Sequence, residues 1–250
     1  MKILTAVVLG MVIILTPLCY SQSPLRIEQI QAEVRENLEK INSYYSQIEI
    51  MFFQAGGENM QITGEIFFAK PDKIKMTMGV KGSESTNQYM YSDGDTLWQY
   101  MPFFKLASKV DLKALKEEFP NAEELVKNQS QIDNILMNIG NPEFEGIEDL
   151  DGESVYVIKG DVPKNVESEL ELGESIEKTK IFISKKDGLH RKVEYYSSTN
   201  QLLYMQGLKS LKINIEIPDS TFEFQLPEGI NVLDSTPQAR ELLLKSHPDS

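Results

Sequence analysis

The chain has 250 residues, and its 25 basic against 38 acidic side chains give a formal net charge of −13. This acidic balance excludes a nucleic-acid-binding protein, which needs a basic surface to neutralise phosphate, and a basic peripheral membrane protein. One cysteine excludes an intrachain disulfide framework, and two histidines argue against a zinc site built from Cys and His, so an ordinary globular protein is expected.

Residues 1–21 have the pattern of a secretory signal peptide. Lys2 gives a positive start, and the apolar run Ile3–Leu15 follows it. This run is shorter than the about 20 residues that cross a bilayer, so a retained anchor is the weaker interpretation. We expect cleavage after Ser21, which leaves residues 22–250 as a single exported domain.

The single cysteine, Cys19, falls within this segment. Its lipidation is the alternative to simple cleavage, but bacterial lipoprotein signals usually place a small residue before the cysteine, where this chain has Leu18. Cleavage would also remove Lys2, which changes the formal charge from −13 to −14 and leaves an exported chain without a thiol.

An amphipathic helix of about 18 residues is predicted at the start of the mature chain. Ser23-Pro24 has the form of an N-cap followed by proline at the first helical position. Apolar residues then recur at three- and four-residue spacing: Ile27, Ile30, Val34, Leu38 and Ile41.

From residue 46 the apolar period becomes that of β-strands. The predicted strands of this half are 47–54, 60–68, 74–80, 87–91, 96–101 and 105–110. Turn residues separate several of them, notably Gly56-Gly57, Pro71-Asp72 and Ser92-Asp93-Gly94-Asp95. Alternation of apolar and polar residues predicts antiparallel pairing with one apolar face.

Residues 111–139 interrupt the strands with two helical stripes. The first runs from Leu112 to Phe119, Pro120 breaks the pattern, and the second is expected to end at Gly140 as a C-cap.

Strands resume after this insertion. The predicted strands of the second half are 144–150, 154–160, 179–184, 189–196, 202–208 and 211–217. The acidic segment 163–178 is expected to form a mobile loop, and residues 236–245 a short helix.

The count is therefore about ten to twelve short antiparallel strands, a leading helix and a helical insertion. So long a sheet must curl or split into two layers. The predicted fold class is α+β and mostly β, with one curved sheet covered by helices. If the sheet closes incompletely, the helices must plug its open mouth.

No pattern of catalytic or cofactor-binding residues stands out. The motifs GxSxG, HExxH and CxxC and a Gly-rich phosphate loop are absent from the sequence. Asp93-Gly94-Asp95 is better explained as a hairpin turn than as a pair of metal ligands. His190 lacks a recognisable nucleophile partner and is expected at the surface. We therefore expect no enzyme, no metal site and no cofactor.

The apolar inventory is unusual. Ten methionines, ten tyrosines and eleven phenylalanines concentrate on the predicted strands, often on one face. Methionine is flexible and adapts to irregular apolar partners. Two interpretations fit this composition: a plain sheet core packed against helices, and a concave apolar surface that takes flexible chains.

Several segments are similar to the periplasmic outer-membrane lipoprotein carrier (LolA-like) family. Gly64–Pro71 (GEIFFAKP) resembles its glycine, short aromatic strand and basic residue before proline, and Ser92–Phe103 (SDGDTLWQYMPF) its Ser-Asp-Gly turn and Leu-Trp strand. Phe52-Phe53-Gln54 resembles the family's Phe-x-Gln strand, and Phe222–Ile230 its closing segment. The resemblance runs from about residue 27 to 235.

The resemblance implies an incomplete antiparallel β-barrel whose apolar cavity is covered by helices. It also implies a monomeric periplasmic carrier that takes acylated lipoproteins from an inner-membrane ABC transporter to an outer-membrane acceptor. Each buried methylene contributes about 0.8 kcal/mol, so a bare acyl chain cannot cross water. A cavity that held the chain fully could not release it, so the cavity must be deformable.

The resemblance further suggests the residues of the site. Those expected to line or flank the cavity are Phe53, Ile66, Phe68, Met76, Met78, Met90 and Trp98. In the family the basic residue before proline, normally arginine, holds the lid closed, and the matching residue is Lys70. Lysine offers three donors on a point charge in place of arginine's planar fork, so the latch is expected to differ. This departure raises the alternative of a lipid-binding or envelope-stress regulatory relative that binds a partner protein, while a dedicated carrier remains the first interpretation.

Overall fold

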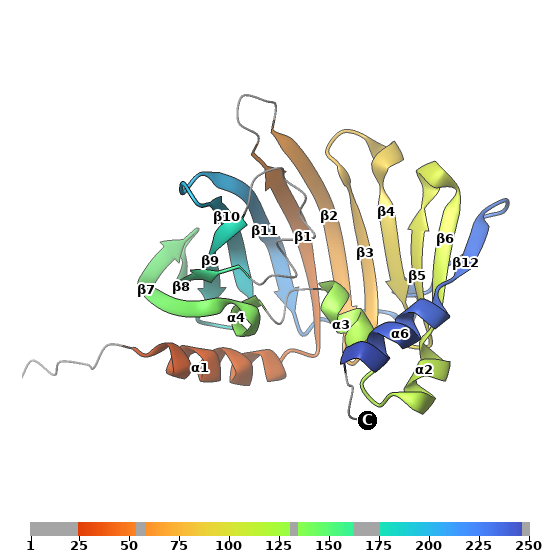
Figure 1. Ribbon diagram of the computed structural model, residues 1–250, viewed down its shortest axis with the longest axis horizontal. Helices are drawn as coiled ribbons and strands as arrows, with labels where there is room; N and C mark the ends of the chain where they lie inside the picture. The colour runs from red at the N-terminus through yellow and green to blue at the C-terminus, as the bar shows by residue number, and fades with distance from the viewer. Residues whose placement is uncertain (1–24, 54–58, 131–134, 163–175, 247–250) are drawn as a thin grey trace, which may run out of the picture.

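The computed structural model describes residues 25–53, 59–130, 135–162 and 176–246 (Figure 1). Their strands form one twelve-stranded sheet in the order β12-β6-β5-β4-β3-β2-β1-β11-β10-β9-β8-β7. The strands are β1 (Ser43–Phe52), β2 (Met60–Ala69), β3 (Lys73–Val80), β4 (Gln88–Ser92), β5 (Thr96–Met101), β6 (Leu106–Asp111), β7 (Gly140–Leu150), β8 (Glu153–Asp161), β9 (Ile176–Ser184), β10 (His190–Ser197), β11 (Leu202–Ile213) and β12 (Asn231–Asp234).

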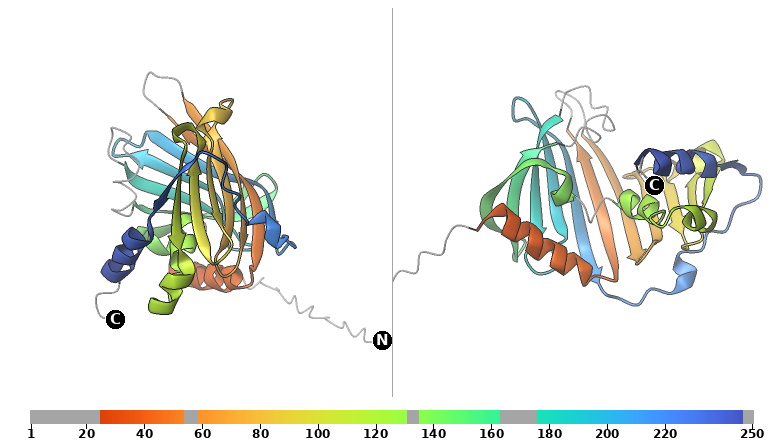
Figure 2. Two further views of the ribbon diagram at one scale, coloured as in Figure 1. Left: turned by 90° about the vertical axis from the view of Figure 1, so that its right-hand side faces the viewer. Right: turned by 60° about the horizontal axis from the view of Figure 1, so that its bottom comes forward.

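The sheet is strongly curved but open. All neighbouring strands pair antiparallel except β12 and β6, which pair parallel. The edge strands of the described sheet, β12 and β7, lie at opposite ends of the strand order, and Figures 1 and 2 show the sheet curling between them. The predicted half-open barrel of ten to twelve strands is therefore confirmed.

Two strand predictions were wrong at the second half of the sheet. β11 is one strand where two were predicted, because Ser210, with a φ of 54°, lies in a bulge and the pairing with β1 continues beyond it. β12 was missed, since all four of its residues are exposed and give no alternation.

Two boundary predictions also need correction. Gly140 begins β7 and is not a helix C-cap. The acidic loop predicted over 163–178 is shorter at its end, because β9 begins at Ile176; residues 163–175 lie outside the described residues. The signal peptide 1–21, Ser23-Pro24 and Gly56-Gly57 also lie outside them.

Five α-helices are described, and they cover one face of the sheet, called the inner face below (Figure 2). They are α1 (Ile27–Glu39), α2 (Leu112–Glu118), α3 (Glu124–Ser130), α4 (Ile135–Asn138) and α6 (Thr236–Ser246). The leading helix and the terminal helix were predicted, and the second stripe of the insertion corresponds to α3 and α4. None of the described helices is both long and apolar enough to cross a membrane.

Helix α1 packs on the half of the inner face formed by β8, β9 and β10. Ile30 and Val34 are buried against Ile158 and Ile181, which are inward-facing strand residues. The approach is close at the β9–β10 turn, where Gly188 has a φ of 78° and a Cβ would lie 2.8 Å from the carbonyl oxygen of Val34. Glycine is therefore required both by the turn and by the helix docked on it.

Helices α2, α3 and α6 pack at the other half. Leu112 of α2 and Val126 of α3 lie in one buried cluster with Ile66, Phe68 and Ile74. Leu243 of α6 packs in turn on α2. The helices thus bury the strand positions on the lower part of the inner face as drawn in Figure 1.

One histidine prediction was wrong. His190, expected at the surface, is the first residue of β10 and is buried. The alternation of a single strand does not reveal this burial.

Candidate functional site

The upper part of the inner face carries a row of methionines. Cross-strand partners point to the same face of a sheet, and the register pairs Ile66 with Met76 and Met76 with Met90. Met78 lies opposite Gly64, where a side chain would overlap the carbonyl oxygen of Thr77. The absence of a side chain at Gly64 lets the β3 backbone and Met78 pack directly against β2.

This row lines a cleft of about 410 Å³, called the methionine cleft below. It is lined by residues of β2, β3, β4 and β5 and of the turn before β4: Ile62, Met76, Met78, Gly79, Val80, Thr86, Gln88, Tyr89, Met90, Gln99, Tyr100 and Met101. The volume falls in the range of roughly 300–1,000 Å³ that is usual for small-molecule sites. Flexible thioether side chains let such a cleft adapt its shape to an apolar guest.

The predicted cavity residues fall into three groups. Met76, Met78 and Met90 line the methionine cleft. Ile66 and Phe68 lie deeper in the buried cluster under α2 and α3, where Phe68 stacks on Tyr44 with ring centroids 5.3 Å apart. The structure thus brings five of the seven onto one inner face.

The other two predicted residues lie elsewhere. Phe53 follows the end of β1 and is partly buried, and its amide donates a hydrogen bond to the carbonyl oxygen of Leu203. Its neighbour Phe52 is the one that packs on the inner core, in edge contact with Tyr204. Strand alternation therefore turns Phe53 to the other side.

Trp98 lies on the outer face of the sheet. It is the cross-strand partner of Tyr91, and its ring lies 5.2 Å from that of Phe224. Tyr91 and Tyr100 also contact Phe224, at 5.3 and 5.6 Å between ring centroids. The closing segment near residue 222 therefore returns across the outside of β4 and β5, and Trp98 anchors it rather than lining the cleft.

Two tyrosines lie between the half of the inner face that α1 covers and the half that α2 and α3 cover. Tyr195 and Tyr204 are paired across β10 and β11, in edge contact with ring centroids 5.3 Å apart. Burial raises the pKa of Tyr195 to about 12 and raises the pKa of Tyr204 as well. The pKa values rise because burial disfavours the charged phenolate.

Lys70 contacts the end of helix α1. It follows β2, and its Nζ donates hydrogen bonds to the carbonyl oxygens of Glu39, at 3.0 Å, and of Leu38, at 3.3 Å. The last carbonyls of a helix lack partners within the helix and carry partial negative charge, so an ammonium group is favourable there. Lys70 thus joins the sheet to one covering helix.

Asp72, two residues later, joins the same turn to a second covering helix. Its side chain is only 3% exposed and forms an ion pair with Lys116 of α2. Lys116 also donates a hydrogen bond to the carbonyl oxygen of Gly94. The hydroxyl of Ser92 donates to the backbone carbonyl oxygen of Asp72 at 2.8 Å. The Pro71-Asp72 and Ser92–Gly94 segments, far apart in sequence, therefore meet at α2.

Sequence reasoning missed the Asp72–Lys116 pair. Asp72 resembles an ordinary turn residue, and Lys116 is one of many lysines on a helix surface. Only the burial of Asp72 distinguishes the pair, and burial depends on how α2 docks.

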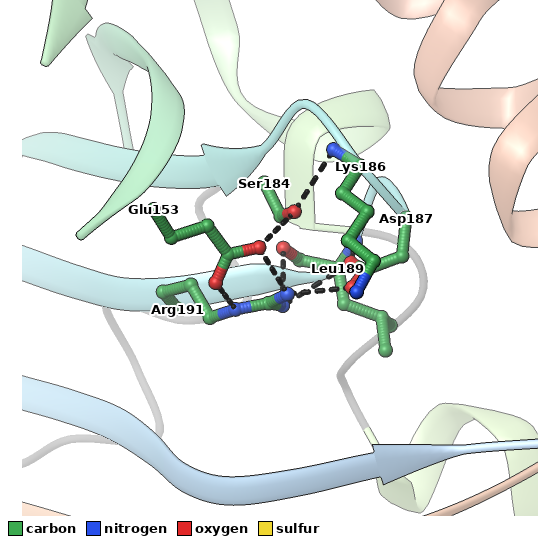
Figure 3. Close-up of polar contacts among 6 residues, drawn as sticks. All are labelled: Glu153, Ser184, Lys186, Asp187, Leu189 and Arg191. Carbon is green, nitrogen blue, oxygen red and sulfur yellow. Dashed lines mark hydrogen bonds and ion pairs between the residues drawn. The ribbon is translucent and has the colours of Figure 1, made fainter. Parts of the chain in front are cut away.

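A polar cluster at Arg191 joins the turns at the other half of the sheet (Figure 3). The side chain of Arg191 is 12% exposed, and its guanidinium forms two hydrogen bonds of 2.7 Å to Glu153. It also donates to Asp187 at 3.1 and 2.5 Å, and Ser184 donates to Glu153. Both carboxylates are engaged by the guanidinium, so we interpret the cluster as a clamp between β8 and the β9–β10 turn.

The clamp is expected to make stability depend on acid. Partial burial alone would raise the pKa of Glu153, but hydrogen bonds from Arg191 and Ser184 and the charge of Arg191 outweigh it and lower the pKa. The stabilisation is complete above the ordinary pKa of 4.5 and is lost as pH falls through the lower pKa of the folded protein. Melting temperatures should therefore fall less below pH 4.5 in Glu153→Gln than in the unchanged protein. Glu117→Gln, at an exposed position of α2, is the control; equal losses in all three proteins would contradict this role.

No group of three or more His, Cys, Asp and Glu side chains that could hold a metal ion occurs among the residues that the structure describes.

No protein-family model matches the sequence, and no curated protein matches it. Among solved structures, an uncharacterised conserved protein from Thermus thermophilus is similar, with a TM-score of 0.52 and 10% identity over 83% of this chain and 98% of that chain. A LolA superfamily protein from Nitrosomonas europaea has a TM-score of 0.35 and 12% identity, over 80% of this chain and 98% of that one.

A third similar structure, the MucA/MucB complex of Pseudomonas aeruginosa, has a TM-score of 0.46 and 11% identity, over 80% of this chain and 61% of that one. The likeness to the Thermus protein shows a shared fold alone. The two scores below 0.5 support no conclusion about this chain.

Proposed function

We propose that this protein binds acyl chains in the methionine cleft and carries acylated lipoproteins through the periplasm. In this proposal it receives them from an inner-membrane ABC transporter and delivers them to an outer-membrane acceptor, as the sequence resemblance implies. The observation that carries the proposal is the cleft itself, a methionine-rich and uncharged surface beside the inner-face positions that α2 and α3 bury.

The residues suit an acyl chain better than a polar ligand. Met76, Met78 and Met90 form the wall, and none of the residues that line the cleft carries a charge. Each methylene moved from water into such a wall contributes up to about 0.8 kcal/mol. Ile66 and Phe68, buried at the end of the same rows, would meet a longer chain if the covering helices moved.

The covering helices would act as the lid of this proposal. Lys70 and Asp72 contact α1 and α2 from one turn, so displacing that turn would loosen both helices. A lid held by a few polar contacts can yield to an incoming chain and close again after release.

A displacement assay tests the binding step. A fluorescent fatty acid whose emission rises in apolar surroundings should bind the mature protein at a ratio of one to one, and a synthetic acylated peptide should displace it. Absence of probe binding would contradict the carrier function. Displacement by one periplasmic partner protein, with no effect of acylated peptides, would favour an envelope regulator instead.

Lys70→Met is expected to loosen α1. The variant removes both hydrogen bonds to the helix C-terminus, whose net contribution is about 0.5–1.5 kcal/mol each. Amide hydrogen exchange in residues 27–39 should speed up by about tenfold, and the probe should dissociate faster. Lys70→Arg should retain most of the protection, while Lys40→Met, which removes an exposed pair with Glu36, serves as the control. Unchanged exchange in Lys70→Met would remove the latch from the proposal.

A further inference from the structure

Two neighbouring phenylalanines are exposed at the tip of the β5–β6 hairpin. Phe103 is 73% exposed and Phe104 is 65% exposed, and their rings contact each other edge to face at 5.2 Å between centroids. Single exposed apolar residues are normal on protein surfaces. Two adjacent aromatic rings that are both mostly exposed at one tip are unusual.

The tip is held in a defined shape. Pro102–Phe104 forms one turn of 3-10 helix, and the amide of Lys105 closes it on the carbonyl oxygen of Pro102 at 2.9 Å. Lys105 has a φ of 50°, and its carbonyl oxygen accepts a hydrogen bond of 3.0 Å from the amide of Asn231, at the start of β12. A turn fixed on both sides presents its two rings outward at little further entropic cost.

The tip lies at the rim of the methionine cleft. Met101 lines the cleft and directly precedes the tip, and the neighbouring turn 84–86 lies against it. Figure 1 shows the ends of β4, β5 and β6 that carry these turns pointing away from α2, α3 and α6. The rings therefore stand at the open end of the cleft, opposite the covering helices.

The charge around the tip differs from that of the whole chain. The chain carries a formal charge of −13, but Lys105 is the only charged residue in 101–106. The adjacent turn adds Lys81 and Glu84, which cancel, and Glu228, three residues before the start of β12 beside the tip, balances Lys105. An acidic protein would thus approach a lipid surface best at this end, where the exposed aromatic rings meet a rim of little net charge.

We propose that the Phe103–Phe104 tip inserts into the surface of a phospholipid bilayer and holds the open end of the methionine cleft against it. This inference rests on the proposed acyl-chain binding, because it supplies the path by which a chain leaves the bilayer for the cleft without crossing water. Phenylalanine rings are well suited to the boundary between headgroups and acyl tails.

Vesicle flotation tests the tip. The mature protein should float with phosphatidylcholine vesicles. In the variant Phe103→Ser/Phe104→Ser, the fraction of protein that floats should fall at least tenfold. The matched control is Leu242→Ser/Leu244→Ser on α6, which removes two leucines that are 61% and 51% exposed and should float as the unchanged protein does. Binding to phosphatidylglycerol vesicles should be weaker, because the net negative charge opposes it.

Two further measurements separate insertion of the tip from a defect of the cleft and from self-association. Binding of the soluble fatty-acid probe should stay within twofold in the tip variant, so that loss of the tip is distinguished from failure of the cleft. In Phe103→Trp on a Trp98→Phe background, bromine-labelled lipid tails should quench the emission, since Trp98 is the only other tryptophan. Equal flotation of tip and control variants, absence of quenching, or self-association that only the tip variant loses would overturn the proposal.

Discussion

Replacing Met78 with lysine is expected to weaken acyl-chain binding at least tenfold, which corresponds to about 1.4 kcal/mol. The side chain of Met78 lines the methionine cleft on β3, opposite Gly64 of β2. An ammonium group placed there must stay hydrated, so water would remain where the acyl chain lies. Titration of the fluorescent fatty acid measures the change directly.

The neighbouring residue supplies a matched control for this variant. Thr77 lies on the same strand but points to the outer face, where it pairs with Glu65. Thr77→Lys introduces the same charge next to the same backbone and should leave the probe affinity within twofold. Met78→Leu keeps the wall apolar and should retain binding. Equal affinities of Met78→Lys and Thr77→Lys would show that the ligand, if any, binds elsewhere.

The second large effect is expected at the ion pair between the β2–β3 turn and α2. Lys116→Met should lower the free energy of unfolding by about 3 kcal/mol, because it leaves the carboxylate of Asp72 buried without its cation. Asp72→Asn should cost less, since Lys116 is one-third exposed and can turn to water. Urea denaturation followed by circular dichroism measures both.

The double variant decides whether the pair acts as a unit. Asp72→Asn/Lys116→Met removes both charges and should recover at least half of the loss seen in Lys116→Met. Lys113→Met, an exposed lysine of the same helix, should change the unfolding free energy by less than about 0.5 kcal/mol. A loss in the double variant equal to the sum of the single losses would show that the two side chains contribute independently.

The methionines of the cleft could be placed from the sequence, whereas Trp98 could not. Met76, Met78 and Met90 could be placed on one face by counting alternate residues, because cross-strand pairing preserves faces once hairpin turns fix the register. Trp98 could not be placed in this way. The resemblance placed Trp98 beside the cavity. Its cross-strand pairing with Tyr91 instead places it on the outer face of the sheet, where its ring contacts Phe224.

The helices show the same limit. The apolar stripe of α1 was predictable from its spacing, and so was the basic residue Lys70 before Pro71. The target of Lys70 was not predictable in detail, since the contact depends on the end of α1 arriving at the end of β2. Lys116, the partner of Asp72, and Glu153, a partner of Arg191, come from elements that meet only in the folded sheet.

Several features could be predicted from the sequence alone, because they depend on local composition and spacing. They are an acidic chain without a disulfide framework, alternating strands joined by Asp-Gly and related turns, a mostly β fold with covering helices, and methionines on one strand face. These features follow from interactions within a few residues or between adjacent strands. The tertiary structure alone decided the bulged β11, the parallel edge strand β12, the burial of Asp72 and His190, and the exposure of Phe103 and Phe104. Burial is a property of distant segments packed together, and the period of a single strand carries no information about which segment will cover it.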